Sequence, residues 1–380
     1  MSTNDIGLTH IQKLKICAVR DQNELNSELV KKYGQNCGNE LFSELADANC
    51  PKSPYEVIGD DYDLAMLIAG AFDADFVRNV CDWIADHRDS FGDTILEVGC
   101  GCGFITTFLG TLFPDKHITS IDRNEGIISI AKKNAELFGL NNIEFVCSDV
   151  AGLSGKTYDT VLSVRTMHEN CKQDAVDVDM RFYDLAKLFA DVQKEYAITL
   201  GSLVNESGTL VTIERCGIDY KFYAWLSVLS GVGLNITPQS HGEIKCLEVG
   251  RESLFEAIVC EKNKLTPQDT DIVFRQIYRS NRDTDKTRYE GWDAKYIFES
   301  SIRRIIAEFE TTIKNSERKS IVIVANIKRD GGHFFLYNLD KGYALLQVIP
   351  LEDLDMIVAD LENQMEMARN SGTVATKRIV

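Results

Sequence analysis

Apolar residues recur at helical spacing through the N-terminal part of the chain. Between residues 74 and 87, several large apolar side chains fall on one helical face: Phe76, Val77, Val80, Trp83 and Ile84. Residues 25–33 and 61–72 show similar spacing, and all three segments predict helices. We therefore predict that residues 1–92 form a helical N-terminal cap.

The pattern changes to short β-branched apolar runs that alternate with helical stretches. The first five runs are TILEVGC, HITSID, IEFVCSD, YDTVLSV and GTLVTIER. Such alternation is typical of a parallel sheet with crossover helices. Two further runs, EIKCLEV and LFEAIVCEK, are separated only by a short turn, which predicts an antiparallel pair at the sheet edge. Residues 93–264 are thus predicted to be an α/β domain with a doubly wound, mixed sheet of seven strands.

Helical and strand-like patterns are mixed after residue 265. The tetrapeptide TPQD at residues 266–269 has the residue types of a helix start. Apolar residues between 296 and 313 share one stripe, which predicts another helix. The runs SIVIVANIK, GHFFLYNLD and GYALLQVI follow, and then an amphipathic segment over residues 351–369. We predict that residues 265–380 form an α+β module with three strands, and that the last ten residues are frayed.

Composition is typical of a globular protein. The 380 residues are 44% hydrophobic and carry a net charge of -17, which disfavours broad adhesion to nucleic acid or to an anionic membrane. We find no signal peptide and no run of the ~18 apolar residues that a membrane span needs. Eleven irregularly spaced cysteines, without a C-x-x-C pair, fit neither a disulfide framework nor a zinc site. We expect reduced thiols, a cytoplasmic protein and no metal.

A glycine-rich turn follows the first predicted strand. The strand at residues 94–98 runs into GCGCG at residues 99–103, and a helical pattern comes next. Glycines let a ligand approach the backbone closely, and a helix N-terminus offers unpaired N–H groups. A dinucleotide fingerprint would need glycine where Phe104 stands, which weakens a pyrophosphate interpretation.

The stretch ILEVGCGCGFIT matches an E/D-x-G-x-G-x-G signature, and from here the sequence resembles the class I S-adenosylmethionine-dependent methyltransferases. Asp122 ends the second predicted strand and Asp149 ends the third, where that family has acidic residues. The resemblance covers roughly residues 91–264 and implies S-adenosyl-L-methionine as the cofactor. It also implies that Asp122 accepts hydrogen bonds from the ribose hydroxyls, that Asp149 lies near the adenine amine, and that Glu97 helps to hold the amino end of the methionine moiety.

The cofactor-binding residues that this resemblance implies come from the ends of successive strands. They are Glu97, Gly99, Cys100, Gly101, Gly103, Asp122, Arg123, Asp149, Val150 and Arg165. Simpler interpretations remain open: the two aspartates could be turn or helix-cap residues, and the glycines could form only a tight turn.

Methyl transfer from a sulfonium requires a positioned nucleophile and removal of its proton. The fourth predicted strand ends directly in RTMHEN, at the edge where doubly wound sheets bind ligands. His168 is therefore the candidate catalytic base, because imidazole titrates near neutral pH. It could instead be a histidine that packs or bonds to solvent at a helix start. We interpret Arg165 and Glu169, which are four residues apart, as an ion pair on a helix face.

The fifth predicted strand ends in Glu214-Arg215-Cys216, and an aromatic helix follows it. Tyr220, Phe222, Tyr223 and Trp225 could line a substrate pocket or form a core-facing stripe. The N/D-P-P-Y/F signature of methylases of exocyclic base amines and glutamine is missing after the fourth strand, and the paired glutamates of arginine methyltransferases are not recognisable. We predict O- or N-methylation of a small-molecule acceptor.

Two other functions stay open. The protein could be a cofactor-binding regulator or assembly partner with the methyltransferase fold, or a methyltransferase that acts on a protein or RNA. Residues 262–330 hold 15 basic and 11 acidic residues, as a nucleic-acid surface or a solvated face would. The strands of the C-terminal module are apolar on both faces, so one face must pack against another surface. We expect this surface to be a second copy of the chain, in a homodimer through this module.

Overall fold

The structure is a computed structural model that describes residues 6–46, 54–171, 180–262, 268–283, 286–313, 319–327, 333–340, 343–370 and 374–378. Chain contacts divide it into two compact units. The first comprises Met1–Lys172, Gln193–Gly217 and Leu226–Ile277, and the second comprises Gln173–Val192, Ile218–Trp225 and Tyr278–Val380. The N-terminal helices and the parallel sheet therefore share one unit. The division of the sequence at residues 92 and 264 stays a prediction.

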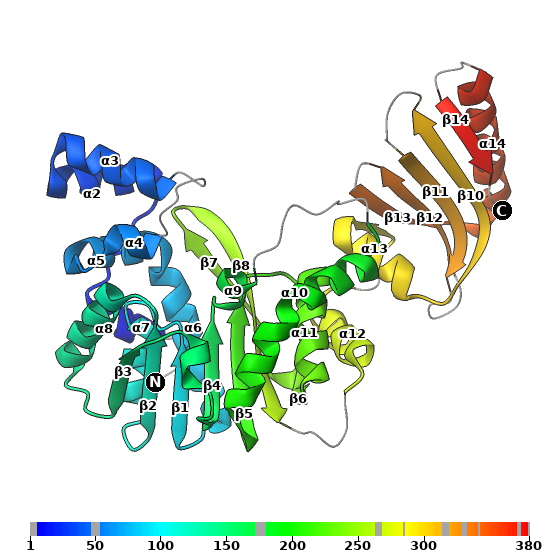
Figure 1. The fold of residues 1–380 in the computed structure, drawn as a ribbon. Helices are drawn as coiled ribbons and strands as arrows, with labels where there is room; N and C mark the ends of the chain where they lie inside the picture. Colours follow the sequence, from blue (N-terminus) through cyan, green and yellow to red (C-terminus); the bar gives the residue numbers. More distant parts are fainter. Residues whose placement is uncertain are drawn as a thin grey trace. The chain divides into compact units, whose positions relative to one another are not determined.

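The first unit begins with a series of helices (Figure 1). They are α1 (Ile6–Leu14), α2 (Gln22–Tyr33), α3 (Gln35–Ala46), α4 (Pro54–Ile58), α5 (Tyr62–Phe72) and α6 (Ala74–Asp86). The side chain of Asp21 accepts hydrogen bonds at the start of α2, and Asp61 does so at the start of α5. Such caps satisfy N–H groups that have no partner within the helix. The helices predicted near residues 25–33, 61–72 and 74–87 are confirmed.

The large sheet has the strand order β3-β2-β1-β4-β5-β8-β6, with β7 also paired to β8. Its strands are β1 (Thr94–Val98), β2 (His117–Asp122), β3 (Ile143–Cys147), β4 (Tyr158–Val164), β5 (Val204–Glu214), β6 (Leu234–Ile236), β7 (Gly242–Glu248) and β8 (Arg251–Lys262). Strands β1 to β5 are parallel, and β8 is antiparallel to β5, β6 and β7. The predicted fold class is confirmed, and the short β6 adds one strand to the seven predicted.

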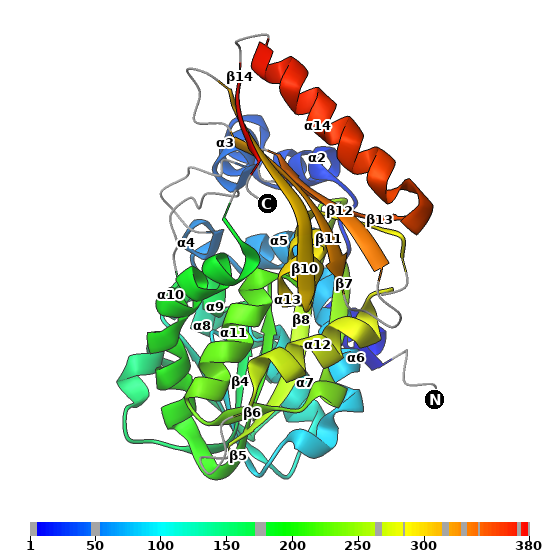
Figure 2. The same ribbon diagram turned by 90° about the vertical axis from the view of Figure 1, so that its right-hand side faces the viewer.

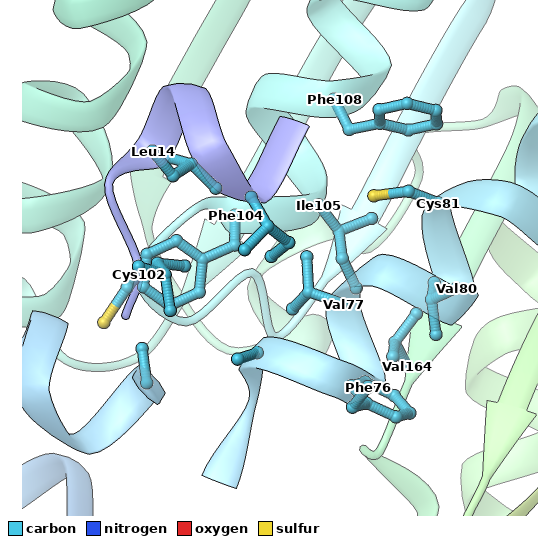
Figure 3. Close-up of a cluster of buried hydrophobic side chains, with 14 of the residues drawn as sticks. Leu14, Phe76, Val77, Val80, Cys81, Cys102, Phe104, Ile105, Phe108 and Val164 are labelled. Atoms are coloured by element: carbon cyan, nitrogen blue, oxygen red, sulfur yellow. The ribbon is translucent and has the colours of Figure 1, made fainter. Parts of the chain in front are cut away.

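The main crossover helices are α7 (Phe104–Leu112), α8 (Glu125–Phe138), α10 (Phe182–Leu203) and α11 (Tyr220–Gly231), and the short α9 (Met167–Asn170) follows β4. A buried apolar cluster joins α1, α6 and α7 to the sheet (Figure 3). Leu14 of α1, Val77 of α6 and Phe104 of α7 are among its members. The N-terminal helices thus pack on the helix that follows the glycine turn, and they help to fix where that turn lies.

His10 strengthens this packing. Its Nε2 lies 2.7 Å from the carbonyl oxygen of Phe104, the first residue of α7, and its ring contacts Phe108 and Phe138. Burial lowers the pKa of His10 to about 4, so the side chain is neutral at physiological pH. A neutral imidazole can hydrogen-bond in an apolar core at little cost.

The second unit contains an antiparallel sheet of six strands in the order β14-β10-β11-β12-β13-β9. They are β9 (Arg288–Glu290), β10 (Arg303–Ile313), β11 (Lys319–Ile327), β12 (His333–Asp340), β13 (Tyr343–Ile349) and β14 (Val374–Arg378). The helix α14 (Leu354–Asn370) lies along one face, over a cluster that includes Ala307, Phe309 and Val324 (Figures 1 and 2). Phe298 of α13 (Gly291–Ser300) stacks on Tyr337 with ring centroids 4.1 Å apart.

Three predictions for this region are wrong. Residues 303–313 are not a helix but strand β10, because they pair with β11 on one side and β14 on the other. The sheet has six strands rather than three, since β9, β10 and β14 join those predicted. Residues 374–378 are not frayed, because they form β14. The helix predicted after residue 265 is α12 (Thr270–Asn281), and Thr266 lies outside the described residues.

None of the described helices is both long enough and apolar enough to cross a membrane. The predicted homodimer through the C-terminal module stays a prediction.

Candidate functional site

The parallel strands β1 to β5 end at one edge of the large sheet, where doubly wound sheets bind their ligands. Four segments of the predicted site lie at this edge, because each ends or follows a strand. They are the glycine turn at residues 99–103 after β1, Asp122 at the end of β2, Asp149 after β3 and Arg165 after β4. Since β1 lies between β2 and β4, the glycine turn lies between Asp122 and Arg165.

The three glycines of the turn all have positive φ: 69° at Gly99, 52° at Gly101 and 74° at Gly103. Residues with a side chain rarely adopt this conformation. A Cβ atom at Gly99 would lie 2.6 Å from Cγ2 of Thr166, and one at Gly103 would lie 2.8 Å from Cβ of Ala131 in α8. Packing within the protein therefore requires glycine at both outer positions.

Gly101, the middle glycine, has more room. The nearest described atom to a Cβ at this position would be Cε1 of Tyr55 in α4, at 3.8 Å. The backbone N–H of Gly101 donates to Oδ2 of Asp122 at 3.0 Å, so the carboxylate lies beside this open position. A group the size of a methyl fits at this position without a clash. Sequence reasoning missed Tyr55, because no local pattern links α4 to a turn so much further along the chain.

Asp122 joins the glycine turn to the start of α8. Its second oxygen, Oδ1, accepts a hydrogen bond from the backbone N of Asn124 at 3.0 Å, and Asn124 in turn caps α8 by accepting from Ile127 N. Asp122 is half-buried. The carboxylate thus has a structural role in the turn, and its contact with ribose hydroxyls stays a prediction.

Asp149 is exposed and caps a short 3-10 turn, η3 (Val150–Leu153). Its Oδ1 accepts from the backbone N of Gly152 at 2.8 Å. In this structure Asp149 is therefore a cap residue, which is one of the interpretations that the sequence left open. Cys100 is buried, and its backbone N donates to the carbonyl of Ile121 at 2.9 Å. The cofactor contacts of Asp149, Val150 and Cys100 stay predictions.

Glu97 lies inside the protein, behind the glycine turn, and is 2% exposed. Its Oε2 accepts hydrogen bonds from Thr106 of α7 and from Ser120 of β2. Burial raises the pKa of Glu97 to about 7, because the charged carboxylate loses solvation. The side chain therefore supports the elements around the turn, and its predicted part in holding the cofactor stays untested.

Arg165 follows β4 with a positive φ of 58°. Its guanidinium donates to Asp73 at 2.6 Å and to Glu248 at 3.0 Å, and it lies 3.5 Å from the centroid of the Phe76 ring. These contacts tie the end of β4 to the start of α6 and the end of β7. The predicted role of Arg165 in cofactor binding remains a prediction.

The ion pair predicted between Arg165 and Glu169 is wrong. Helix α9 begins only at Met167, so Arg165 precedes the helix, and Glu169 pairs instead with Arg123 at 3.5 Å. His168 lies in α9, but its side chain is outside what the structure describes. Its role as catalytic base therefore stays a prediction.

The aromatic stripe after β5 faces a core. Tyr220, Phe222 and Trp225 are 6%, 1% and 1% exposed, and the ring of Tyr220 lies 4.4 Å from that of Trp292. This supports the core-facing interpretation. Sequence reasoning did not assign a role to Glu214 at the end of β5, although its place at a strand end was a signal. Glu214 is 1% exposed, and burial raises its pKa to about 8.

Within the described ranges, no group of three or more His, Cys, Asp or Glu residues is arranged to hold a metal ion. The ten cysteines that the structure describes are all free.

The part of the chain that contains strands β1 to β5 is similar to known proteins. Residues 89–214 match a family model described as a methyltransferase domain. The chain is similar to a malonyl-[acyl-carrier protein] O-methyltransferase of Bacillus anthracis, with 42% identity over 84 residues, or 21% of this chain and 30% of that protein. It is also similar to a probable (S)-tetrahydroprotoberberine N-methyltransferase 2 of Papaver bracteatum, with 31% identity over 74 residues, or 19% of this chain and 21% of that protein. The chain thus spans less than a third of these relatives.

A solved structure of magnesium protoporphyrin IX methyltransferase from Synechocystis, with bound SAM, is 16% identical in sequence. The match covers 61% of this chain and 96% of that chain, with a TM-score of 0.35.

Proposed function

We propose that the protein is an S-adenosylmethionine-dependent methyltransferase, because residues 89–214 match a model of a methyltransferase domain. The observation that carries the proposal is the arrangement at the end of β1. There the open position at Gly101 adjoins the carboxylate of Asp122, which is held 3.0 Å from the Gly101 backbone N. A turn with this much room lets a ligand lie against the backbone, and a carboxylate beside it can accept hydrogen bonds from ligand hydroxyls.

The residues at the sheet edge fit S-adenosyl-L-methionine. When bound, this cofactor supplies a methyl group on a positively charged sulfur. Gly101 would lie against the methionine part, Asp122 would accept from the ribose hydroxyls, and Asp149 would lie near the adenine amine. Glu97 would support the turn from behind, since its carboxylate bonds to α7 and β2.

The acceptor we propose is a small molecule with an oxygen or nitrogen nucleophile. The relatives named above are O- and N-methyltransferases, which supports this class of reaction. His168 would remove the proton of the nucleophile, because α9 begins where β4 reaches the ligand-binding edge of the sheet.

Cofactor binding is tested by titration calorimetry with S-adenosylmethionine. We expect the wild-type protein to bind, and the change Asp122→Asn to weaken binding by about 1–3 kcal/mol through loss of charge-assisted hydrogen bonds. Asp115→Asn is the matched control, because Asp115 is an exposed aspartate in the turn before β2, at the opposite edge of the sheet. Absence of wild-type binding, or equal affinity of all three proteins, would contradict the proposed site.

Methyl transfer is tested separately with cofactor that carries a radioactive methyl group, incubated with fractions of a metabolite extract. We expect label in a small molecule. Label in protein or RNA would assign the acceptor to that class instead. Binding without any transfer would favour the regulatory or assembly role.

A further inference from the structure

Glu214 joins three elements at the ligand-binding edge of the sheet. Its Oε1 accepts a hydrogen bond from Oγ of Ser163 in β4 at 3.1 Å, and its Oε2 accepts from the backbone N of Met167, the first residue of α9, at 3.1 Å. Thr212 of β5 donates to the same carboxylate at 3.4 Å. Because Glu214 is 1% exposed, these contacts replace the water that the carboxylate loses on burial.

A chain of hydroxyl groups extends this arrangement. Oγ1 of Thr166 lies 2.5 Å from Oγ of Ser163 and accepts from the hydroxyl of Tyr196 in α10 at 2.6 Å. All three side chains are buried. The methyl group of Thr166 is the atom that a Cβ at Gly99 would strike, so the chain reaches the glycine turn directly.

We propose that Glu214 is a positioning residue for methyl transfer, which fixes residues 165–167 against Gly99 and thereby sets the place of His168 in α9. This inference rests on the proposed function. These contacts explain how Arg165 keeps its left-handed backbone conformation. Such an unfavourable conformation persists only where the surrounding contacts hold it in place. Met167 N, at the start of a helix, also gains the acceptor that it needs.

The charge state of Glu214 offers a way to observe this role. Burial raises its pKa to about 8. Among the side chains that the structure describes, the titratable groups that face it are Tyr196 of α10, Cys171 after α9, and Glu256. Glu256 pairs with Glu214 across β5 and β8 and lies 2.6 Å from His241. Burial raises the pKa of Cys171 to about 12 and that of Tyr196 above its usual value, so neither ionises in the range where Glu214 does.

Protonation of Glu214 changes which group donates and which accepts in the hydrogen bonds between Glu214, Ser163 and Thr166. The ionised carboxylate accepts from Ser163, whereas the protonated carboxyl donates a hydrogen bond. Either hydroxyl of the Ser163–Thr166 pair can be the donor, so the pair can accommodate both states. The contacts of the turn at residues 165–167 therefore depend on pH, and this dependence is absent when residue 214 cannot ionise.

The experiment follows the methyl signal of Met167 by NMR, in full-length protein labelled with carbon-13 in its seven methionines. The variant Met167→Leu assigns the signal. We expect the signal to shift with a midpoint near pH 8 in wild type, and to be flat in Glu214→Gln. Glu299→Gln is the matched control, because Glu299 is another largely buried glutamate with a raised pKa that accepts from backbone N–H groups, those of Phe182 and Tyr183. We expect the wild-type titration in that variant.

A Met167 signal that does not titrate in wild type, or that still titrates in Glu214→Gln, overturns the proposal. The second result would assign the titration to a group other than Glu214. This measurement needs neither cofactor nor acceptor, so it decides the role of Glu214 in the turn even if the proposed function fails.

The catalytic part is measured with S-adenosylmethionine and whichever labelled acceptor fraction the wild type uses. Above pH 8, where Glu214 of the wild type is ionised, we expect Glu214→Gln to lower kcat by ~10-fold or more while cofactor affinity changes less than ~3-fold, because glutamine lacks the charge to which Ser163 and Met167 N donate, whereas the ligand-facing groups remain. Tyr196→Phe removes only the outer hydroxyl, so it serves if Glu214→Gln does not fold, and it should lower kcat with unchanged cofactor affinity. An unchanged kcat and pH profile in the folded variants overturns the proposal, whereas a wild type that transfers no methyl group refutes the proposed function.

Discussion

Gly103 allows the sharpest test of how the glycine turn is built. It precedes α7 with φ 74° and ψ 23°, the left-handed conformation, and the backbone of α8 lies close by. A Cβ atom at this position would lie 2.8 Å from Cβ and 3.0 Å from Cα of Ala131. Gly139, after α8, has nearly the same conformation, with φ 66° and ψ 33°, but a Cβ there meets nothing within 4 Å. The change Gly103→Ala therefore combines conformational strain with a steric clash, and Gly139→Ala has the strain alone.

The two contributions differ in size. A side chain in the left-handed conformation costs about 1–2 kcal/mol relative to glycine. Forcing an extra methyl group into a packed interior costs typically ~1–3 kcal/mol more. The clash at Gly103 cannot be relieved by rotation of a flexible side chain, because the atoms it meets are Cα and Cβ of Ala131, which is 0% exposed. We expect Gly103→Ala to lose about 2–5 kcal/mol and Gly139→Ala about 1–2 kcal/mol of unfolding free energy.

Urea unfolding followed by far-ultraviolet circular dichroism measures both losses under identical conditions. Ala131→Gly supplies a further check: combined with Gly103→Ala it removes one partner of the clash, so the double variant should be more stable than the sum of the single changes predicts. Equal losses in Gly103→Ala and Gly139→Ala, or additive behaviour of the double variant, would refute the claim that α8 requires glycine at residue 103.

Three further predictions concern pH and the C-terminal sheet. The pKa of Glu97 is raised from 4.5 to about 7, so its contribution to stability is full below pH 4.5 and is lost as pH rises through 7, by about 1.4 kcal/mol per pH unit. Urea unfolding at several pH values should show that the unfolding free energy of Glu97→Gln depends less on pH than that of the wild type. His10 has the opposite sign: its pKa is lowered from 6.5 to about 4, so its contribution is full above pH 6.5 and is lost towards pH 4, and His10→Gln should remove that slope, whereas an unchanged slope would place the titration elsewhere. Truncation after Asn370 removes β14 and exposes an edge of β10, and we expect light scattering to show more association than in the full chain; equal association of the two chains would contradict this.

The sequence alone determined the elements whose signals are local. The runs of β-branched residues and the glycines at 99–103 placed β1, β2 and the turn, because alternation of strands and helices and the conformational freedom of glycine are properties of short segments. Asp122 ends a strand that is visible in the pattern, but its predicted place in a cofactor site came from the resemblance to a methyltransferase family. The fold class follows from the local features, and the candidate cofactor site follows from that resemblance.

Strand β10 shows where local pattern failed. Its apolar residues fit a helical stripe, yet the isoleucines and threonines of RRIIAEFETTI suit a strand equally well. The choice was made by pairing with β11 and β14, which are other segments of the chain. A single sequence does not reveal which partner strands are available.

Charge partners and burial were likewise decided only by the tertiary structure. Arg165 and Glu169 have the spacing of a helical ion pair, but the helix starts two residues after Arg165, and its guanidinium binds Asp73 and Glu248, which are 92 and 83 residues away. In the sequence, nothing distinguishes Glu214 from the other acidic residues that end strands. Its raised pKa and its bond to Met167 N exist because α9 and α10 cover it, and such long-range packing is set by the fold as a whole.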